Sequence, residues 1–590
     1  MKRFFLLLLL FNWLGTTLTG QTNPDWRSKI STELLASYEQ GEKMDVLVAF
    51  REQADLSPAR ALKTKLEKAE FVYQQLQQTA SRSQARAIQV LRASNARANS
   101  YYLVNAIAIE SADPALLPLL AKMPEVRSIS IDPWVYFQEP VQETPPIAQR
   151  NAVEWGVEKI NAPLVWAMGY TGQGITVGGA DTGYDWTHPA LQGKYRGWNA
   201  SQETASHQFN WHDAIHEVNP LNDSTATNPC GLNTTAPCDD GLHGTHTMGT
   251  MTGDDELGNQ IGVAPGARWI GCRNMERGYG KPSTYIECFQ WFLAPTNLDG
   301  LNANPGLAPH VINNSWSCPA IEGCTDLAVN DLIRQAVINL KASGVVVVVS
   351  NGNLGGEGCS STYSPPAYFE ESFSVGSTRF DDTLSGFSSR GPILIDDSGR
   401  IKPNVSAPGS FVRSCIPGAG YQYLNGTSMA GPHVVGLVAL ILSARPDLAG
   451  NVELIEHIVE QSAVYKIDPD NCGIDGTQRP NNAYGWGRVD ALQALNMILE
   501  EVSPTQEPTV LTASVSPNPT SGKVLFDLQN ITGATSLTIF STDGKLVYHK
   551  DWAIQNRDWL LVSLENEQAG IFFWQVKTAK GMVSGKVVKE

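Results

Sequence analysis

The sequence predicts an α/β fold with a mostly parallel central sheet, preceded by a small α/β domain and followed by a small antiparallel β-sandwich. Two short apolar runs, residues 174–181 and 344–350, end at turn-forming residues, as strands buried in a parallel sheet do. A strongly apolar helical run over residues 434–442 would cover such a sheet. From Leu511 onward short alternating strands are separated by turn residues, which is typical of an antiparallel sandwich.

Residues 1–20 have the parts of a secretory signal peptide. Lys2 and Arg3 precede a mostly apolar run over residues 4–14, and small residues follow up to Gly20. The alternative is a membrane anchor, for which the run is short. We therefore expect the protein to be exported from the cytoplasm.

The length of the chain indicates a protein of several domains, and its net charge argues against a nucleic-acid-binding protein. A chain of 590 residues has room for three or four domains with ample core. The net charge of −16 and the lack of a basic stripe argue against nucleic acid as a partner.

Residues 21–147 predict the small N-terminal domain. Strand-like and helical patterns alternate along this segment, with strands over residues 44–50, 104–110 and 126–133 and helices over residues 58–99 and 115–122. This order describes a sheet with helices on one face.

Three polar side chains lie where the central elements end or begin. Asp181 ends the first apolar run, so a parallel strand would deliver its carboxylate to the carboxyl edge of the sheet. His243 stands on a glycine-flanked turn that enters a helix of small residues. Ser428 opens the apolar helix, beside free N–H groups and the positive end of the helix dipole. For Ser428 alone the alternative is a helix cap.

Together these residue types suit nucleophilic catalysis. A serine hydroxyl is a weak nucleophile until an imidazole accepts its proton, and a buried carboxylate orients that imidazole and stabilises its charged form. The sequence therefore predicts Ser428 as nucleophile, His243 as proton shuttle and Asp181 as its orienting partner.

The motifs around these residues carry a family resemblance. Asp181-Thr-Gly, His243-Gly-Thr-His and Gly426-Thr-Ser-Met-Ala-Gly-Pro-His resemble the three signatures of subtilisin-like serine peptidases, in the same order along the chain. Trp155-Gly-Val-Glu-Lys-Ile-Asn-Ala-Pro and residues 181–191 most resemble the bacillopeptidase F group. The resemblance implies a subtilisin-like three-layer fold for residues 148–500 and peptide-bond hydrolysis through an acyl-enzyme.

The same resemblance gives the N-terminal domain a role. Residues 21–147 resemble the inhibitory propeptide of these enzymes, which helps the peptidase to fold and covers the active site until it is cut. The Pro/Gln/Glu-rich segment 138–149 is the expected junction. The alternative is an ordinary accessory domain.

An oxyanion donor is expected after the second apolar run. In Asn351-Gly-Asn353 the family pattern favours Asn353, whose side-chain amide would stabilise the oxyanion together with the backbone N–H of Ser428. Asn351 departs from the small residue usual in that place. The alternative for either asparagine is a turn residue.

Residues 311–317 resemble the strand of these peptidases that pairs with an extended substrate. Ser315, Trp316 and Ser317 would line the cleft, and backbone pairing would hold the peptide as an added strand. For Trp316 the alternative is a plain core aromatic.

Neither a metal nor another cofactor is needed for this chemistry. His243 and His246 lack the glutamate that completes the pattern His-Glu-x-x-His, so a metallohydrolase is a weak alternative. Structural calcium is compatible with the resemblance, but the sequence shows no EF-hand-like ligand loop.

Nine cysteines fit an oxidising compartment. Proximity along the chain suggests three disulfide pairs, Cys230–Cys238, Cys272–Cys288 and Cys318–Cys324. Cys359, Cys415 and Cys472 remain, and the odd number leaves at least one thiol free or paired with another molecule.

The C-terminal part follows a polar linker over residues 501–510. Ser516-Pro-Asn-Pro-Thr-Ser-Gly, Asp543-Gly-Lys and Ala569-Gly-Ile-Phe-Phe resemble the C-terminal sorting domain of type IX secretion cargo, which implies a cell with an outer membrane. In residues 511–590 we expect strands over residues 524–528, 536–541, 545–549, 560–564, 570–577 and 585–589. The alternative is a carbohydrate- or protein-binding β module.

The sequence as a whole predicts a secreted or surface-located serine endopeptidase made as an inactive precursor. Its expected partners are protein or peptide substrates, its own propeptide and the type IX secretion machinery, and we expect a monomer. The alternative is a catalytically silent surface binding or adhesion protein that keeps the fold.

Overall fold

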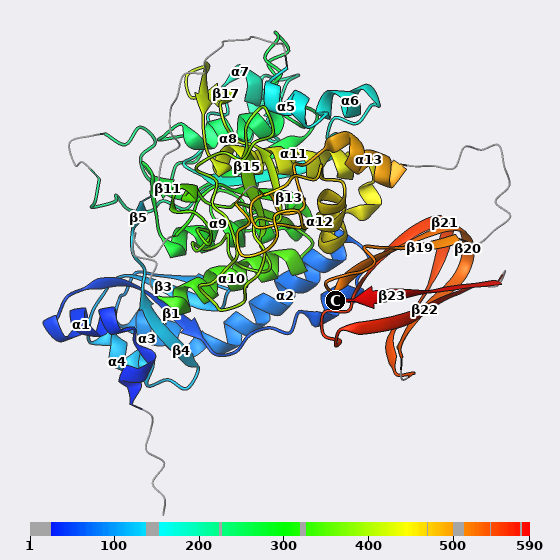
Figure 1. The fold of residues 1–590 in the computed structure, drawn as a ribbon. Coiled ribbons are helices and arrows are strands. Elements are labelled where there is room, and N and C mark those ends of the chain that lie inside the picture. Colours follow the sequence, from blue (N-terminus) through cyan, green and yellow to red (C-terminus); the bar gives the residue numbers. More distant parts are fainter. Residues whose placement is uncertain are drawn as a thin grey trace, which may run out of the picture.

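The computed structural model describes residues 25–136, 153–222, 227–318, 326–468, 470–499, 512–542, 544–578 and 581–590. These ranges form an N-terminal α/β domain, a central α/β domain and a C-terminal β domain (Figure 1). The predicted signal peptide, the junction and the linker lie outside the described residues.

The N-terminal domain is a four-stranded antiparallel sheet with the strand order β2-β3-β1-β4. Its elements are α1 (Thr32–Gln40), β1 (Met44–Phe50), α2 (Lys65–Ser83), α3 (Ala85–Ala93), β2 (Ala98–Tyr101), β3 (Ala106–Ala112), α4 (Leu116–Ala121) and β4 (Val126–Ile131). The three predicted strands are confirmed, whereas β2 was not predicted, and its first two residues, Ala98 and Asn99, were assigned to the end of a helix. Three of the four residues of β2 are exposed, so it carries no apolar alternation by which a strand is recognised.

The two faces of this small sheet pack against different partners. Val46, Val48 and Phe50 of β1 share a core with α1, α3 and α4. Leu47 and Ala49, on the opposite face, share a core with α2 and with two helices of the central domain. The prediction that the helices lie on one face of this sheet is therefore wrong for α2, which covers the opposite face together with the central domain.

The central domain is built on a seven-stranded sheet with the order β16-β15-β14-β13-β6-β10-β9. All its strand pairs are parallel, which confirms the predicted mostly parallel sheet. The strands are β6 (Thr176–Asp181), β9 (Trp211–Asp213), β10 (Arg268–Arg273), β13 (Val311–Asn314), β14 (Val346–Ser350), β15 (Phe373–Thr378) and β16 (Val405–Pro408).

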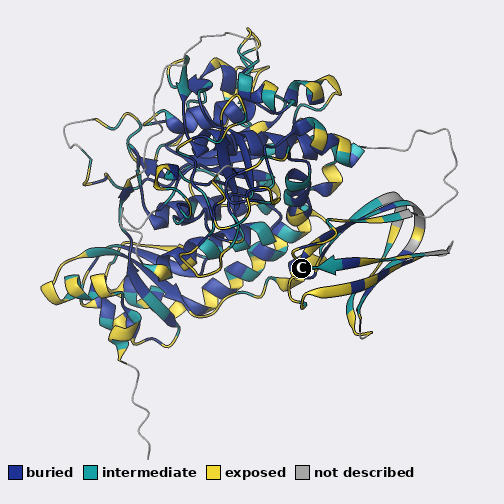
Figure 2. Ribbon diagram, in the orientation of Figure 1, coloured by how far each residue is buried: buried dark blue, intermediate teal, exposed yellow. Residues whose placement is uncertain are grey.

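Helices cover both faces of this sheet and make a three-layer domain. The side chains of Val346 and Val348 share a core with α11 (Thr427–Ala444), close to α8 (His243–Thr252). Val347 and Val349 point to the other face, toward α9 (Pro282–Leu293) and α10 (Leu327–Ala342). Because both faces are covered, β14 is a run of buried valines that ends at the buried Ser350, and Figure 2 shows the middle of the domain mostly in the dark blue of buried residues.

Helix α11 is the described helix that is long and apolar enough to cross a membrane, yet it lies buried within the domain. The remaining elements of the central domain are short helices and hairpins around this core: α5 (Trp155–Lys159), α6 (Ala162–Ala167), α7 (Pro189–Gln192), α12 (Val452–Gln461), α13 (Ala491–Leu499), β7 (Trp198–Asn199), β8 (Thr204–Ala205), β11 (Met275–Glu276), β12 (Tyr279–Gly280), β17 (Val412–Ile416) and β18 (Gly420–Leu424).

The C-terminal domain is an antiparallel sheet of β19 (Thr512–Ser516), β20 (Lys523–Ser541), β21 (Leu546–Ser563), β22 (Gly570–Thr578) and β23 (Gly581–Lys589). Both halves of β20 contribute to one buried core, so the sheet folds over on itself as the predicted sandwich requires. The predicted strands over residues 524–528 and 536–541 are parts of β20, and those over residues 545–549 and 560–564 correspond to β21. The expected breaks were wrong because the ladder between β20 and β21 continues through Gly533, with register shifts only after Gln529 and after Ile539.

The C-terminal domain packs on the central domain beside α12 (Figure 1). Leu525 is buried in the central core, and Trp559 and Leu561 pack against it. The Arg445 guanidinium lies 4.7 Å from the centroid of the Trp559 ring.

Disulfides join Cys230 to Cys238 and Cys272 to Cys288, as their spacing predicted. Cys318 is disulfide-bonded, and its predicted partner Cys324 lies outside the described residues. Cys359 pairs with Cys472, and Cys415 is a buried free thiol.

Candidate active site

Asp181 is the last residue of β6 and lies completely buried at the carboxyl edge of the sheet. Its Oδ1 accepts hydrogen bonds from His243 Nδ1 at 2.7 Å and from the backbone N–H of Thr182 at 2.8 Å. The hydroxyl of Thr247 lies 3.4 Å from Oδ2. The strand end thus presents a buried carboxylate to the histidine, as predicted.

His243 is the first residue of α8 and is 3 % exposed. The helix enters close beside the loop after β6, and a side chain at Gly244 would place its Cβ only 2.0 Å from Gly183 O. Glycine is therefore required for this approach. Because a carboxylate oxygen only accepts, Nδ1 donates this hydrogen bond, and in a neutral imidazole Nε2 is then the nitrogen that accepts.

Ser428 is the second residue of α11, which packs directly against α8. Its hydroxyl donates to the carbonyl oxygen of Ser315 at 3.4 Å, and the Ser315 hydroxyl donates to the carbonyl oxygen of Ser428 at 2.9 Å. Ser315 follows β13, the neighbour of β6. The fold therefore brings the predicted aspartate, histidine and serine to one edge of the sheet.

The two candidate oxyanion asparagines have different surroundings. Oδ1 of Asn353 accepts hydrogen bonds from the backbone N–H and the hydroxyl of Thr427, both at 2.9 Å, directly beside Ser428. The amide of Asn351 donates instead to Ser389 O at 2.7 Å and to Thr362 Oγ1 at 2.9 Å, away from Ser428. The contacts favour Asn353 over Asn351, as the sequence did.

Only part of the predicted substrate-binding segment, residues 315–317, is exposed at the surface. Ser317 is half-buried and Ser315 is fully buried. The indole of Trp316 is 1 % exposed and stacks on the Tyr285 ring, with ring centroids 3.9 Å apart. The core alternative therefore describes the Trp316 side chain, and any contact with substrate would come from its backbone.

Two further histidines near the site have structural surroundings. Nε2 of His246 lies 3.1 Å from both Val412 O and Gln422 O, and burial together with the charge of His243 lowers the pKa of His246 to about 3. Nδ1 of His433 lies 2.9 Å from Met429 O, and burial lowers its pKa to about 4. Both side chains are therefore neutral at ordinary pH.

His243 and His246 do not share a site, because one contacts a carboxylate and the other two backbone carbonyls. Within the described ranges no group of three His, Cys, Asp or Glu side chains is arranged to hold a metal ion.

Sequence reasoning missed a buried carboxylate beside the predicted triad. Asp239 lies four residues before His243 and accepts hydrogen bonds from Thr182 and Thr245, the threonines of the Asp181 and His243 motifs. The signal in the sequence was the pair of acids, Asp239 and Asp240, next to the His243 motif.

Comparison with known proteins identifies the family. The model of the subtilase family matches residues 172–487, more than half of the chain. This chain belongs to the subtilase family. Bacillopeptidase F of Bacillus subtilis is 34 % identical over 513 residues, covering 80 % of this chain but only 33 % of bacillopeptidase F. Subtilisin E of the same species is 32 % identical over 322 residues, covering 54 % of this subtilase and 68 % of subtilisin E.

The solved structures agree on the fold. The crystal structure of an epidermin leader peptide processing serine protease from Staphylococcus aureus superposes with a TM-score of 0.54 at 17 % identity. It covers 78 % of this subtilase and all of that chain.

The C-terminal domain of this subtilase matches a second family. Residues 514–590 match the secretion system C-terminal sorting domain, as the sequence motifs predicted. The chain is thus a member of the subtilase family with a secretion-sorting tail, and the tail points to a secreted or cell-surface protein.

Proposed function

We propose that this subtilase is a serine endopeptidase in which Ser428, His243 and Asp181 form the catalytic triad. The observation that carries the proposal is the buried 2.7 Å contact between His243 Nδ1 and Asp181 Oδ1, at the start of a helix packed against the one that begins at Ser428. A buried carboxylate in this place holds the imidazole in the tautomer that accepts a proton on Nε2.

In the proposed reaction Ser428 Oγ attacks the scissile carbonyl carbon while His243 takes the hydroxyl proton. The tetrahedral oxyanion accepts hydrogen bonds from the Asn353 amide and the Ser428 backbone N–H, aided by the positive end of the α11 dipole. His243 then donates its proton to the leaving amine, and an acyl-enzyme remains. Water hydrolyses this ester by the same steps, with His243 again as the base.

No metal or other cofactor takes part in this proposed chemistry. Ser315, the backbone of Trp316 and Ser317 would hold the substrate as an added strand.

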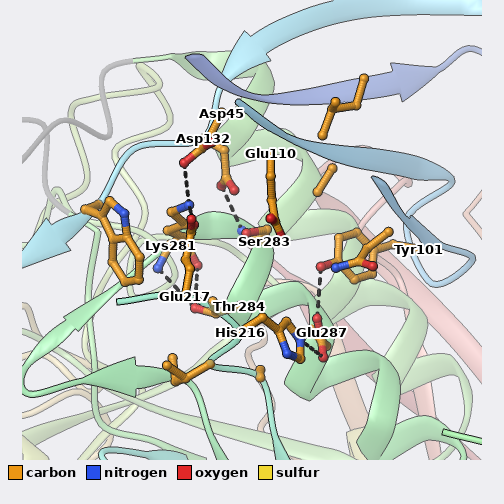
Figure 3. A pocket seen from close by; sticks show the side chains of 16 residues that line it. Asp45, Tyr101, Glu110, Asp132, His216, Glu217, Lys281, Ser283, Thr284 and Glu287 are labelled. Carbon is orange, nitrogen blue, oxygen red and sulfur yellow. Dashed lines mark hydrogen bonds and ion pairs between the residues drawn. The ribbon is translucent and has the colours of Figure 1, made fainter. Parts of the chain in front are cut away.

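The N-terminal domain is proposed to act as an inhibitory propeptide. Its last described strand, β5 (Val135–Tyr136), pairs antiparallel with β12 of the peptidase. Polar contacts between the two domains surround a shared pocket, which Figure 3 shows. In that pocket Tyr101 donates to Glu287 Oε2 at 3.0 Å, and the N–H of Ser283 donates to Asp132 Oδ1 at 3.0 Å. This domain would keep the enzyme inactive until the segment after Tyr136 is cut.

The C-terminal domain is proposed to direct the protein through the type IX secretion machinery to the cell surface or the medium. The enzyme is proposed to act as a monomer on protein or peptide substrates.

Fluorophosphonate labelling of the purified, propeptide-free protein, followed by peptide mapping, tests the catalytic proposal. We expect label on Ser428 and turnover of a generic peptide library, and we expect both to be lost in Ser428→Ala and His243→Ala. A folded, propeptide-free protein that takes no label would refute the proposal and favour the silent binding protein. Activity that a chelator abolishes and fluorophosphonate leaves intact would favour a metallohydrolase.

A further inference from the structure

We propose that Asp239 is a positioning residue that holds the Asp181 and His243 motifs in register. This inference rests on the proposed peptidase function and adds a residue that acts through its neighbours. Asp239 is 9 % exposed and forms an isolated β-bridge with Gly183, two residues after Asp181.

The first link runs through Thr182, the residue after Asp181. The hydroxyl of Thr182 donates to Asp239 Oδ1 at 2.7 Å and accepts the backbone N–H of Gly244 at 3.0 Å. Gly244 follows His243. One hydroxyl thus joins the end of β6, the start of α8 and the Asp239 carboxylate.

The second link is made by Thr245, which belongs to α8 and contacts the loop after β6. Both the hydroxyl and the backbone N–H of Thr245 donate to Asp239 Oδ2, at 2.6 and 2.9 Å. The same hydroxyl accepts the N–H of Asp185 at 2.9 Å. A second hydroxyl therefore ties α8 to the loop after β6, again through Asp239.

The carboxylate is required because four donors converge on it. Besides Thr182 and the two donors of Thr245, the N–H of Gly241 lies 3.0 Å from Oδ1. An ionised carboxylate has two oxygens that accept all four, whereas an asparagine amide offers one oxygen and turns an NH2 group toward two donors. Unsatisfied buried donors are costly, so an amide would loosen the links.

The residues on either side of Asp239 in the chain are also fixed in place. The carbonyl of the preceding Cys238, which is bonded to Cys230, accepts the N–H of Tyr184 at 3.2 Å. The next residue, Asp240, receives a hydrogen bond at 3.1 Å from Arg273, a fully buried side chain that also binds Asp213 through two nitrogens. Asp239 therefore lies in a segment that a disulfide and a buried ion pair hold in place.

These contacts predict an effect on the chemical step. Asp239 binds Thr182 and Thr245, which lie one residue after Asp181 and two residues after His243. Its loss would therefore displace the imidazole relative to Ser428 and leave the substrate cleft in place. Misplacement of a catalytic group by about 1 Å can cost roughly 10²-fold in rate.

The test compares Asp239→Asn, Thr182→Val and Thr245→Val with Thr182→Ser and Thr245→Ser. The valine variants keep side-chain volume and lose the hydroxyl, and the serine variants restore it. Thr250→Val is the matched control, since Thr250 lies buried on the same helix and its hydroxyl donates only to His246 O. Steady-state kinetics and the rate of fluorophosphonate labelling are measured for each propeptide-free protein, with thermal unfolding as the check on folding.

We expect the valine variants and Asp239→Asn to lose about 10- to 100-fold in kcat, with KM within about twofold of wild type. The serine variants should recover most of the rate, and Thr250→Val should match wild type. Folded valine variants with unchanged kcat, or serine variants as impaired as the valine variants, would overturn the inference. Wild-type protein that takes no label would instead refute the proposed function, so the two failures are distinguishable.

Discussion

Asn353 turns the oxygen of its side-chain amide toward Thr427, where the backbone N–H and the hydroxyl both donate to Oδ1 at 2.9 Å. This orientation leaves the NH2 group to face the other way. A Cβ on Gly426, two residues before Ser428, would lie 3.6 Å from Asn353 Nδ2. The amide donor is therefore held beside the start of α11 before any substrate arrives.

Asn353→Ala is expected to lower kcat by roughly 10²–10³-fold with little change in KM, the range seen when a subtilisin loses its side-chain oxyanion donor. The reason is that the donor meets negative charge that develops only in the transition state. Asn351→Ala is the matched control, because its amide binds Ser389 and Thr362. The Asn351→Ala variant should have a lower melting temperature than wild type, whereas its kcat should change little. Steady-state kinetics would contradict this assignment if Asn351→Ala lost more in kcat than Asn353→Ala.

Glu154→Gln is expected to stabilise the protein at alkaline pH. Burial raises the pKa of Glu154 to about 7, against the opposing hydrogen bond from the Arg413 N–H at 3.1 Å. Because the folded-state pKa lies above the unfolded value, stability from the bound proton is present below about pH 4.5 and is lost as pH rises to about 7. The neutral glutamine avoids this loss.

Relative to wild type, the Glu154→Gln variant should therefore gain up to about 3 kcal/mol in unfolding free energy between pH 5 and pH 8. Denaturant unfolding in a Ser428→Ala background, which avoids self-digestion, measures the difference. Glu158→Gln, at an exposed position of α5, is the control and should show no such trend. An equal difference at pH 5 and pH 8 would contradict the prediction.

Lys281→Met is expected to weaken inhibition by the propeptide. Lys281 is 3 % exposed, and its ammonium group donates to Asp45 of the N-terminal domain at 2.6 Å and also to Glu217 (Figure 3). Breaking a fully buried ion pair costs about 3–5 kcal/mol. The loss should be smaller here, because the side chains of Asp45 and Glu217 are 23 % and 34 % exposed and water screens their charges. The inhibition constant of added propeptide, residues 21–147, should therefore rise by about 10- to 10²-fold.

Arg127→Met supplies the comparison for Lys281→Met. Arg127 also reaches across the same boundary, 2.6 Å from Asp331, but both side chains are exposed by a third or more. Exposed pairs contribute about 1 kcal/mol at most, so this change should raise the inhibition constant less than about tenfold. Equal effects of the two substitutions would argue against a special role for the buried lysine.

Trp559→Ala is expected to loosen the sorting domain from the peptidase. The Trp559 ring packs against the central core and under the Arg445 guanidinium. Hydrogen exchange of α12 should become faster, because β21 covers that helix. Phe573→Ala removes a ring that is 50 % exposed on the same domain and should leave exchange in α12 unchanged. Unchanged protection of α12 in Trp559→Ala would show that this contact does not hold the domain.

Several features could be predicted because neighbouring residues in the chain carry the signal. The buried strand over residues 344–350 is apolar throughout, and the motif around Ser428 joins a glycine turn to an apolar helix. Cys230 and Cys238 are close enough in sequence to suggest their own pairing. The long strands β20 and β21 were missed because Gly533 gives a local signal for a break, whereas the partner strand continues the ladder.

The sequence by itself determined the order of the parts, the residue types of the proposed triad and the strands and helices that carry them. These properties depend on local periodicity and on short motifs. Only the tertiary structure decided that the Trp316 indole packs on Tyr285, that Cys359 meets Cys472, and that Asp239 joins Thr182 to Thr245. Each of these depends on contacts between segments distant in the chain, and the parallel sheet creates such contacts by bringing the ends of non-consecutive strands to one edge.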